Sequence, residues 1–317
     1  MAHTHWVSLH TFLHDPAQTL RFLREWITPQ IHQLRQSNVI AQWFFIRYWD
    51  GGPHLRLRFA VRQLADIVQF QQQLQQVIGT YQAAQPIARE QYYGAHQFDG
   101  ASVDADSLLW YGDAVVVPIA YEPETVRYGG VAALSVNERL FQASSDLALR
   151  LCGAGERTAQ QHLLTAMLLM AAGYLAFCPV PARAAQFFDY YAAYWRAYSS
   201  AAAAAEMAAG KSADAALVAK LREFIAAIGD GQASARLELQ WAAQVRAAVD
   251  DFAALYRAGE LELPATATPV TNDDEYAAAV EQMLSSQLHM MNNRLGVLPQ
   301  QECYLARVLA NAFGEMV

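Results

Sequence analysis

The first 130 residues carry short β-prone segments separated by amphipathic helical ones. Aromatic and β-branched side chains fill residues 40–49, and the turn sequence Asp50-Gly51-Gly52-Pro53 separates them from a second such run. The apolar positions of the helical segments recur every three or four residues. The predicted elements are, in order, a strand at 5–13, a helix that begins at Asp15-Pro16, strands at 40–49 and 54–60, a helix at about 63–82 and a strand at 87–93. This β-α-β-β-α-β order matches the ferredoxin-like split βαβ arrangement.

After Gly130 the pattern becomes helical almost throughout. Alanine and leucine become frequent, and the apolar positions keep the helical period. The expected helices lie at about 135–152, 156–178, 183–199, 214–229, 235–258, 274–295 and 300–315. The alanine-rich stretch 201–209 is compatible with a helix extension or a low-complexity loop. We therefore predict an α+β protein with a mixed part at 1–130 and a helical part at 131–317, which together form one compact domain.

Composition and charge exclude several classes of protein. Of the 317 residues, 54% are hydrophobic and 16% charged, which is typical of a globular chain and not of a disordered one. The net charge is −8 and no block of basic residues occurs, which argues against direct binding of nucleic acid.

The sequence also lacks the marks of export, of membrane insertion and of a zinc site. Residues 1–13 have no basic start ahead of an apolar run, and the apolar stretch Leu163–Phe177 is shorter than the roughly 20 residues of a membrane span. The three cysteines are far apart and show no metal-binding spacing. We expect a cytoplasmic protein.

One predicted strand carries a group of cations. In His54-Leu-Arg56-Leu-Arg58, alternate side chains face opposite sides, so His54, Arg56 and Arg58 share one face. Neighbouring guanidinium groups repel unless an anion lies between them, and they bind carboxylate or phosphate through a bidentate fork. We expect Arg47, on the preceding strand, to point to the same side. The alternative is a solvated sheet edge paired with Asp50 or another acid, and the pattern leaves both open.

Two later segments carry polar side chains that fit a site. Glu124 and Arg127 lie three residues apart, just before Gly129-Gly130 at the junction of the two predicted parts. The simpler interpretation is a local ion pair in a connector. His289 and Arg294 lie on a predicted helix near the C-terminus. A lone helical histidine is usually a surface or packing residue, so His289 matters only if it lies near the arginines in space.

Together these segments resemble a known family. The motifs are Trp43-Phe-Phe-Ile-Arg-Tyr, Gly52-Pro-His-Leu-Arg-Leu-Arg-Phe59, Tyr121-x-Pro-Glu-x-x-Arg-Tyr-Gly-Gly130 and His289-Met-x-Asn-x-Arg-Leu295. In this order they are similar to the C-terminal elimination domain of lanthipeptide dehydratases, which also occurs as a stand-alone protein in thiopeptide biosynthesis. The large glutamylation domain of full dehydratases has no counterpart in these residues, so the resemblance implies a split system with a separate, tRNA-dependent glutamylation protein.

The resemblance implies a lyase that acts on a ribosomal precursor peptide with a leader and a glutamylated core. Glutamate attached to a Ser or Thr side chain is β-eliminated, which leaves dehydroalanine or dehydrobutyrine. Motif matching implies that Arg56, Arg58, Glu124, Arg127 and His289 are the active-site residues, with Arg47, His54 and Arg294 as further substrate contacts. His289 is the candidate general acid and base. Whether His289 or Glu124 takes the Cα proton is left open by the sequence. The leaving group is already activated, so no metal or other cofactor is implied.

Two alternatives remain open from the sequence. A sister branch of the same fold makes the six-membered nitrogen ring of thiopeptides by formal [4+2] cycloaddition of two dehydroalanines, and it has less need for arginines that bind glutamate. A non-catalytic module that binds leader peptide is the third interpretation, and it requires that the five matched residues do not converge. A homo-oligomer is compatible with all three, and none calls for a membrane.

Overall fold

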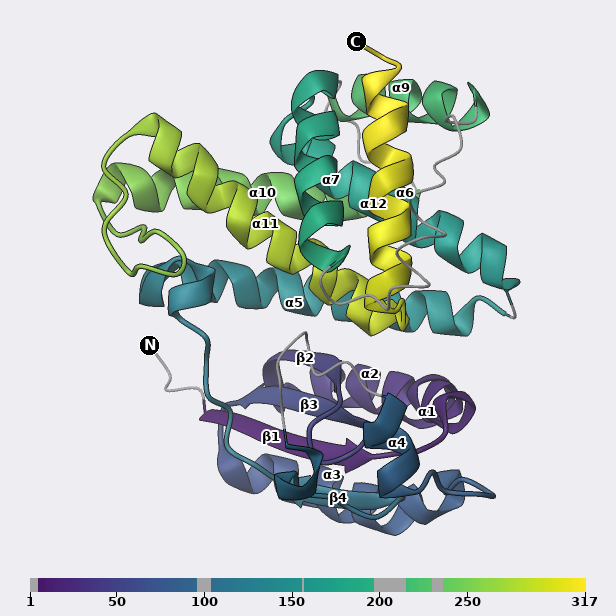
Figure 1. The fold of residues 1–317 in the computed structure, drawn as a ribbon. Coiled ribbons are helices and arrows are strands. Elements are labelled where there is room, and N and C mark those ends of the chain that lie inside the picture. Colours follow the sequence, from purple (N-terminus) through teal and green to yellow (C-terminus); the bar gives the residue numbers. More distant parts are fainter. Residues whose placement is uncertain (1–4, 96–103, 156, 197–214, 230–235) are drawn as a thin grey trace. The chain divides into compact units, whose positions relative to one another are not determined.

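The computed structural model describes residues 5–95, 104–155, 157–196, 215–229 and 236–317. The chain divides into two compact units (Figure 1). The first unit comprises Met1–Pro123 and Ser145–Gly155, and the second comprises Glu124–Ser144 and Glu156–Val317. The predicted alanine-rich stretch 201–209 lies outside the described residues.

The first unit holds a four-stranded sheet with helices between its strands. Its elements are β1 (His5–Phe12), α1 (Pro16–Phe22), the π-helical turn η1 (Leu23–Ile27), α2 (Thr28–Gln36), β2 (Ile40–Tyr48), β3 (His54–Val61), α3 (Leu64–Val77), the 3-10 turn η2 (Ile78–Tyr81), α4 (Arg89–Ala95), the 3-10 turn η4 (Ala105–Ser107) and β4 (Val115–Pro118). The strand order is β2-β3-β1-β4, and every neighbouring pair is antiparallel. The predicted α+β class and the β-α-β-β-α-β order are confirmed.

The predicted strand at 87–93 is wrong, and a different segment supplies the last strand. Residues Arg89–Ala95 form helix α4, in which only Tyr93 is buried among the residues with a described side chain. The Tyr93 hydroxyl donates to the Leu109 carbonyl at 2.8 Å and accepts from the Gly51 N–H at 3.1 Å. The fourth strand is the short run Val115–Pro118, whose β-branched residues pair with β1.

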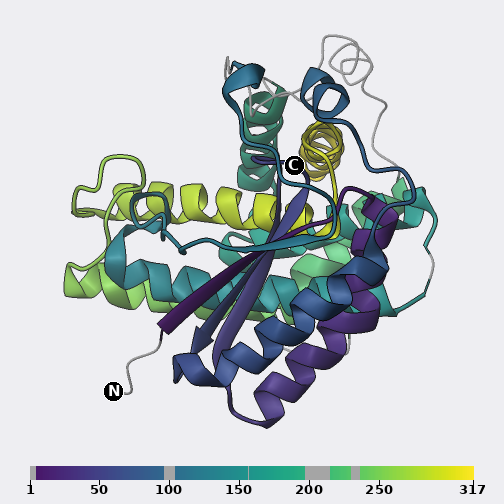
Figure 2. The same cartoon turned by 90° about the horizontal axis from the view of Figure 1, so that it is seen from below.

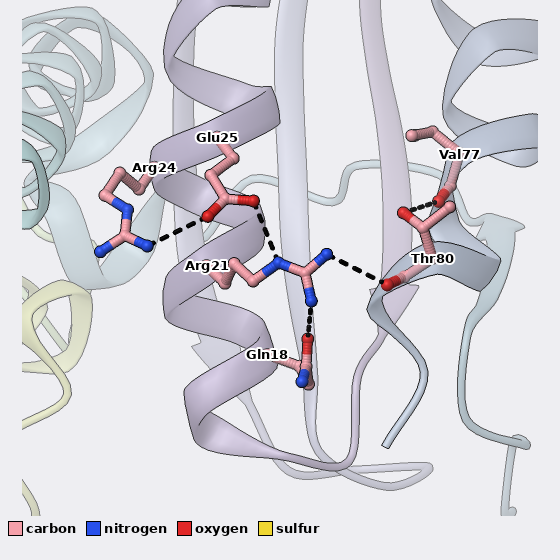
Figure 3. Close-up of polar contacts among 6 residues, drawn as sticks. All are labelled: Gln18, Arg21, Arg24, Glu25, Val77 and Thr80. Atoms are coloured by element: carbon pink, nitrogen blue, oxygen red, sulfur yellow. Dashed lines mark hydrogen bonds and ion pairs between the residues drawn. The ribbon is translucent and has the colours of Figure 1, made fainter. Parts of the chain in front are cut away.

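Two helical segments of the first unit, α1–η1–α2 and α3–η2, lie side by side (Figure 2). Asp15 caps the first of them, since its carboxylate accepts from the Ala17 N–H at 2.7 Å, and Pro16 occupies the first helical position. Figure 3 shows how Arg21 joins the segments, because its guanidinium donates to the Thr80 carbonyl at 3.4 Å, while Glu25 of its own segment pairs with it at 3.0 Å. Apolar contacts beneath these polar ones join the same elements, as in the rings of Phe22 and Tyr81 and of Trp26 and Phe70.

The second unit is helical in its described residues. It contains α6 (Ala159–Phe177), α7 (Pro181–Arg196), α9 (Ala215–Gly229), α10 (Leu237–Ala258), α11 (Asp273–Leu295) and α12 (Pro299–Gly314), while α5 (Gly130–Gly153) is divided between the units after Ser144. These helices agree with the predicted ones within about five residues at each end. The apolar stretch in α6 is a buried helix, with Ala166–Ala176 all buried. Within the described residues, no helix is long and apolar enough to cross a membrane.

The glycine pair after the 3-10 turn η5 (Val126–Tyr128) has a conformational reason. Gly129 and Gly130 adopt φ values of +80° and +93°, which residues with a Cβ rarely adopt. A Cβ on Gly130 would also lie 2.8 Å from the carboxyl carbon of Glu262. The Glu262 N–H donates to the Gly129 carbonyl at 3.0 Å, so the pair lets the chain leave η5 close to a second segment of the same unit.

Candidate functional site

The register of the sheet places His54, Arg56 and Arg58 on one face of β3, as predicted. Arg56 lies opposite His10 of β1, and Arg58 lies opposite Phe44 of β2. Residues that are directly opposite in an antiparallel pair point to the same face. This face of the first unit therefore carries two guanidinium groups among histidine and aromatic rings.

Aromatic rings support both guanidinium groups. The Arg56 guanidinium carbon lies 3.5 Å from the centre of the Tyr48 ring, and that of Arg58 lies 4.3 Å from the centre of the Tyr121 ring and 5.3 Å from that of Phe44. Such stacking stabilises the cation while it leaves the edge of the guanidinium plane, where the N–H groups are, open to hydrogen bonding. These ring contacts hold the arginines without themselves using N–H donors.

His54 is a buried partner of Arg56. Its side chain is only 4% exposed, its Nδ1 lies 2.8 Å from the Gly52 carbonyl, and Arg56 Nε donates to its Nε2 at 3.2 Å. Because Nε2 accepts this hydrogen bond, Nδ1 carries the proton and donates to Gly52. Burial, together with the charge of Arg56, lowers the pKa of His54 to about 4, despite the opposing effect of the Gly52 carbonyl. The neutral ring orients Arg56 and is itself shielded from solvent.

His10 adds a second neutral ring to this layer. It stacks on His54 with ring centres 4.9 Å apart, and it is 4% exposed. Burial lowers its pKa to about 3, with further contributions from His54, Arg56 and Arg58. The fixed positive charge of the face therefore resides on the arginines, which is the condition for attracting an anion.

The expected position of Arg47 is wrong. The register pairs Arg47 with Leu55, so it points to the face opposite that of Arg56 and Arg58. On that face the end of helix α5 packs against β2, since Trp43 Nε1 donates to Asp146 at 2.9 Å. Burial lowers the pKa of the Arg47 guanidinium. Arg47 therefore does not lie with Arg56 and Arg58 on their face of the sheet.

In the second unit, Glu124 and Arg127 form the ion pair that the spacing allows, and Arg127 also contacts helix α11. Arg127 Nη1 lies 3.4 Å from Glu124 Oε2, and its Nε donates to Ser286 Oγ at 3.2 Å. Burial acts to lower the pKa of Arg127, but Tyr128, Glu124 and Tyr194 outweigh it and the pKa is raised. The side chains of Arg127 and Glu124 are 44% and 62% exposed, so both are accessible from solvent.

His289 lies one helical turn beyond Ser286 on α11, and so on the side that Arg127 contacts. Its side chain is 17% exposed, and its Nδ1 lies 2.9 Å from Oε1 of Glu302, a carboxylate with no exposed surface. The Trp195 ring stacks on the imidazole at 4.1 Å. The Nε2 edge is the part of the ring that these contacts leave for a reacting proton.

Arg294 has a different environment. It is fully buried, and its guanidinium carbon lies 5.3 Å from the centre of the Phe141 ring. Its role as a substrate contact stays a prediction, and its burial favours a packing role. Arg56 and Arg58 lie in the first unit, whereas Glu124, Arg127 and His289 lie in the second. Convergence of these five residues on one substrate also stays a prediction.

Comparison with a protein-family model extends over nearly the whole chain. The family model described as "Lantibiotic biosynthesis dehydratase C-term" matches residues 6–313. The chain belongs to the lantibiotic dehydratase C-terminal family. No curated protein sequence matches it significantly. The family membership confirms the resemblance on which the candidate residues rest.

Solved structures share the fold of this lantibiotic dehydratase C-terminal protein. TsrL is 17% identical, with a TM-score of 0.67 over 99% of this chain and 95% of its own. TbtD, a pyridine synthase from thiomuracin biosynthesis, is 16% identical, with a TM-score of 0.69 over 98% of each chain. MibB, a tRNA-dependent lantibiotic dehydratase from Microbispora sp. 107891, is 20% identical with a TM-score of 0.55, and the match covers 98% of this chain but 28% of MibB.

Sequence reasoning missed several residues around His289 in this lantibiotic dehydratase C-terminal protein. Glu302, Ser286, Tyr191 and Trp195 are absent from the candidate residues that the sequence pattern indicates. One signal was available for Glu302, because it shares a helical face with Leu305, Ala306 and Leu309, all buried. A carboxylate on the apolar face of an amphipathic helix indicates a specific buried partner.

Proposed function

We propose that this chain is a glutamate-elimination enzyme that acts on glutamylated Ser or Thr residues of a ribosomally made precursor peptide. The observation that carries the proposal is the layer of Arg56 and Arg58 on one face of β3, backed by two histidines that burial and the arginines keep neutral. Such a layer suits a leaving group that is a carboxylate and carries a second carboxylate.

The elimination needs a base for the Cα proton and a site for the departing carboxylate. When the Cα–H bond breaks, its electron pair forms the Cα=Cβ double bond, and the Cβ–O bond breaks with its electrons passing to glutamate. Guanidinium groups that are already in place stabilise the charge that develops on the leaving oxygen without reorganisation. Arg56 and Arg58 take this role in the first unit, and Arg127 takes it in the second.

His289 is the base in this proposal, and Glu124 is the competing choice. A neutral imidazole accepts a proton at Nε2 while Nδ1 remains bonded to Glu302. Glu124, paired with Arg127 at 3.4 Å, orients that guanidinium or binds the ammonium group of glutamate. Glutamylation has already converted the hydroxyl into a better leaving group, and the elimination is redox-neutral, so the step needs no electron acceptor. A separate tRNA-dependent glutamylating protein supplies the substrate in the cytoplasm.

Pyridine formation is the second candidate function, and the fold similarity to TbtD over 98% of both chains favours keeping it. The experiment is a comparison of two synthetic peptides, one with glutamylated serine and one with two dehydroalanines at a spacing that allows cycloaddition. The proposal predicts loss of glutamate from the first peptide and no ring formation in the second. Ring formation without loss of glutamate would establish the alternative.

A further inference from the structure

A buried polar chain backs His289 in the second unit. Glu302 comes from α12 and Tyr191 from α7, and Tyr191 Oη donates to Glu302 Oε2 at 2.6 Å while the other carboxylate oxygen faces His289 Nδ1 at 2.9 Å. Glu302 has no exposed side-chain surface, and Tyr191 is 3% exposed. Both oxygens of one buried carboxylate therefore have a donor, as a buried charge requires.

We propose that Glu302 is the positioning residue of His289 and that Tyr191 sets how strongly it acts. Glu302 holds the proton of the neutral imidazole on Nδ1 and so directs the Nε2 lone pair toward substrate. This inference rests on the proposed function, because it assigns the acceptor of the Cα proton to Nε2. A carboxylate behind a histidine base fixes the tautomer and stabilises the imidazolium that forms when the proton arrives.

Tyr191 reduces the negative charge that the Glu302 carboxylate presents to His289. A hydroxyl that donates to Glu302 Oε2 draws negative charge away from the oxygen that faces His289. Burial, Glu302 and the hydrogen bond with Glu302 raise the pKa of Tyr191 well above its usual range, so the phenol keeps its proton and remains a donor. Trp195 stacks on the His289 ring, and Arg127 is bound one helical turn away at Ser286.

Two substitutions distinguish a positioning role of Glu302 from simple packing, because they should move the acid limb of the pH–rate profile in opposite directions. Glu302→Gln keeps the shape and removes the charge, so an imidazolium at position 289 loses its stabilisation. Tyr191→Phe leaves Glu302 with His289 as its remaining donor among these contacts, which strengthens that stabilisation. The acid limb of the pH–rate profile should move to lower pH by about one unit in Glu302→Gln and to higher pH in Tyr191→Phe. A packing role would not give shifts of opposite sign.

The chain offers a matched control on the helix that carries His289. Glu281 lies on α11 and, like Glu302, accepts from a tyrosine, Tyr174, at 3.0 Å, but its cationic partner is Arg183 at 3.1 Å. Glu281→Gln and Tyr174→Phe therefore repeat the two chemical changes away from His289. We expect kcat to fall about 10- to 100-fold in Glu302→Gln with KM within about twofold, whereas Glu281→Gln keeps the wild-type kcat.

A measurement that needs no turnover completes the test. Proton–nitrogen NMR correlations on the full chain with labelled histidine, assigned by comparison with His289→Asn, report which ring nitrogen carries the proton. The proposal predicts the proton on Nδ1 in the neutral wild-type ring. A proton on Nε2, or equal limb positions in Glu302→Gln and Tyr191→Phe, would overturn it. A wild-type protein with the proton on Nδ1 that leaves glutamylated peptide unchanged would instead refute the proposed elimination.

Discussion

The free energy of unfolding of the first unit should fall with decreasing pH, in part because two buried histidines, His10 and His54, lie beside Arg56. Burial holds the pKa of His10 at about 3 and that of His54 at about 4 in the folded chain, against an ordinary value of 6.5. Each ring is therefore neutral when folded and takes up a proton on unfolding once the pH falls below 6.5. The stabilising contribution of each ring is complete above pH 6.5 and is lost as the pH falls toward its folded pKa.

The size of the effect follows from proton linkage. One proton taken up on unfolding lowers the free energy of unfolding by about 1.4 kcal/mol for each pH unit. Between pH 6.5 and pH 5, each histidine then removes about 2 kcal/mol. Both rings are 4% exposed, so solvent screens this effect little. His10→Phe keeps a ring stacked on His54 but removes one of the two titrating groups.

The assay is urea denaturation at pH 8, 6.5, 5.5 and 5, followed by circular dichroism. The free energy of unfolding of His10→Phe should fall by about 2 kcal/mol less than that of the wild type between pH 6.5 and pH 5. His32→Gln, at an exposed position of α2, controls for removing a histidine from the first unit and should follow the wild-type curve. Equal pH dependence in His10→Phe and the wild type would refute the neutral histidine layer and the field that the arginines exert on it.

Three further substitutions test the candidate site and the packing around it. Arg127→Ala should leave glutamylated peptide to accumulate in an assay followed by mass spectrometry, and dehydration at the wild-type rate would exclude Arg127 from the reaction. Gly173→Ala places a Cβ 2.7 Å from the Trp241 indole nitrogen and should lower the free energy of unfolding by about 1–3 kcal/mol in urea melts, whereas Gly314→Ala, with no atom within 4 Å, should not. Asp146→Ala leaves the Trp43 indole N–H without its carboxylate and should cost about 1–3 kcal/mol by the same assay, and an unchanged denaturation midpoint would contradict the role of this contact.

Local pattern was enough to predict most helices and the hairpin. Helical periodicity is repeated over many residues, as in Asp273–Leu295, and the strands around Gly51-Gly52 are marked by a turn and by β-branched side chains. The edge strand Val115–Pro118 is four residues long and is defined by its pairing with β1, a long-range contact that no local pattern contains. That is why Ile87–Tyr93 was predicted in its place.

The arginine face illustrates the same limit within one strand pair. Alternation along β3 placed Arg56 and Arg58 together correctly, because both belong to one strand. The side of Arg47 depends on the register across the turn, where Tyr48 pairs with His54, and a shift of one residue would reverse it. The partnership of Glu302 with His289 depends on how α11 and α12 pack, so the sequence showed only that Glu302 lies on an apolar face.

The mass of a peptide carrying one glutamylated serine, after incubation with the purified protein, tests the central claim most directly. Elimination releases glutamate and leaves a peptide that is lighter by one water than its unmodified serine form, and the new double bond should react with an added thiol. We predict this product with the wild-type protein and its loss with His289→Asn. Recovery of the unmodified serine peptide, which hydrolysis would give, or of the intact glutamylated peptide would contradict the account.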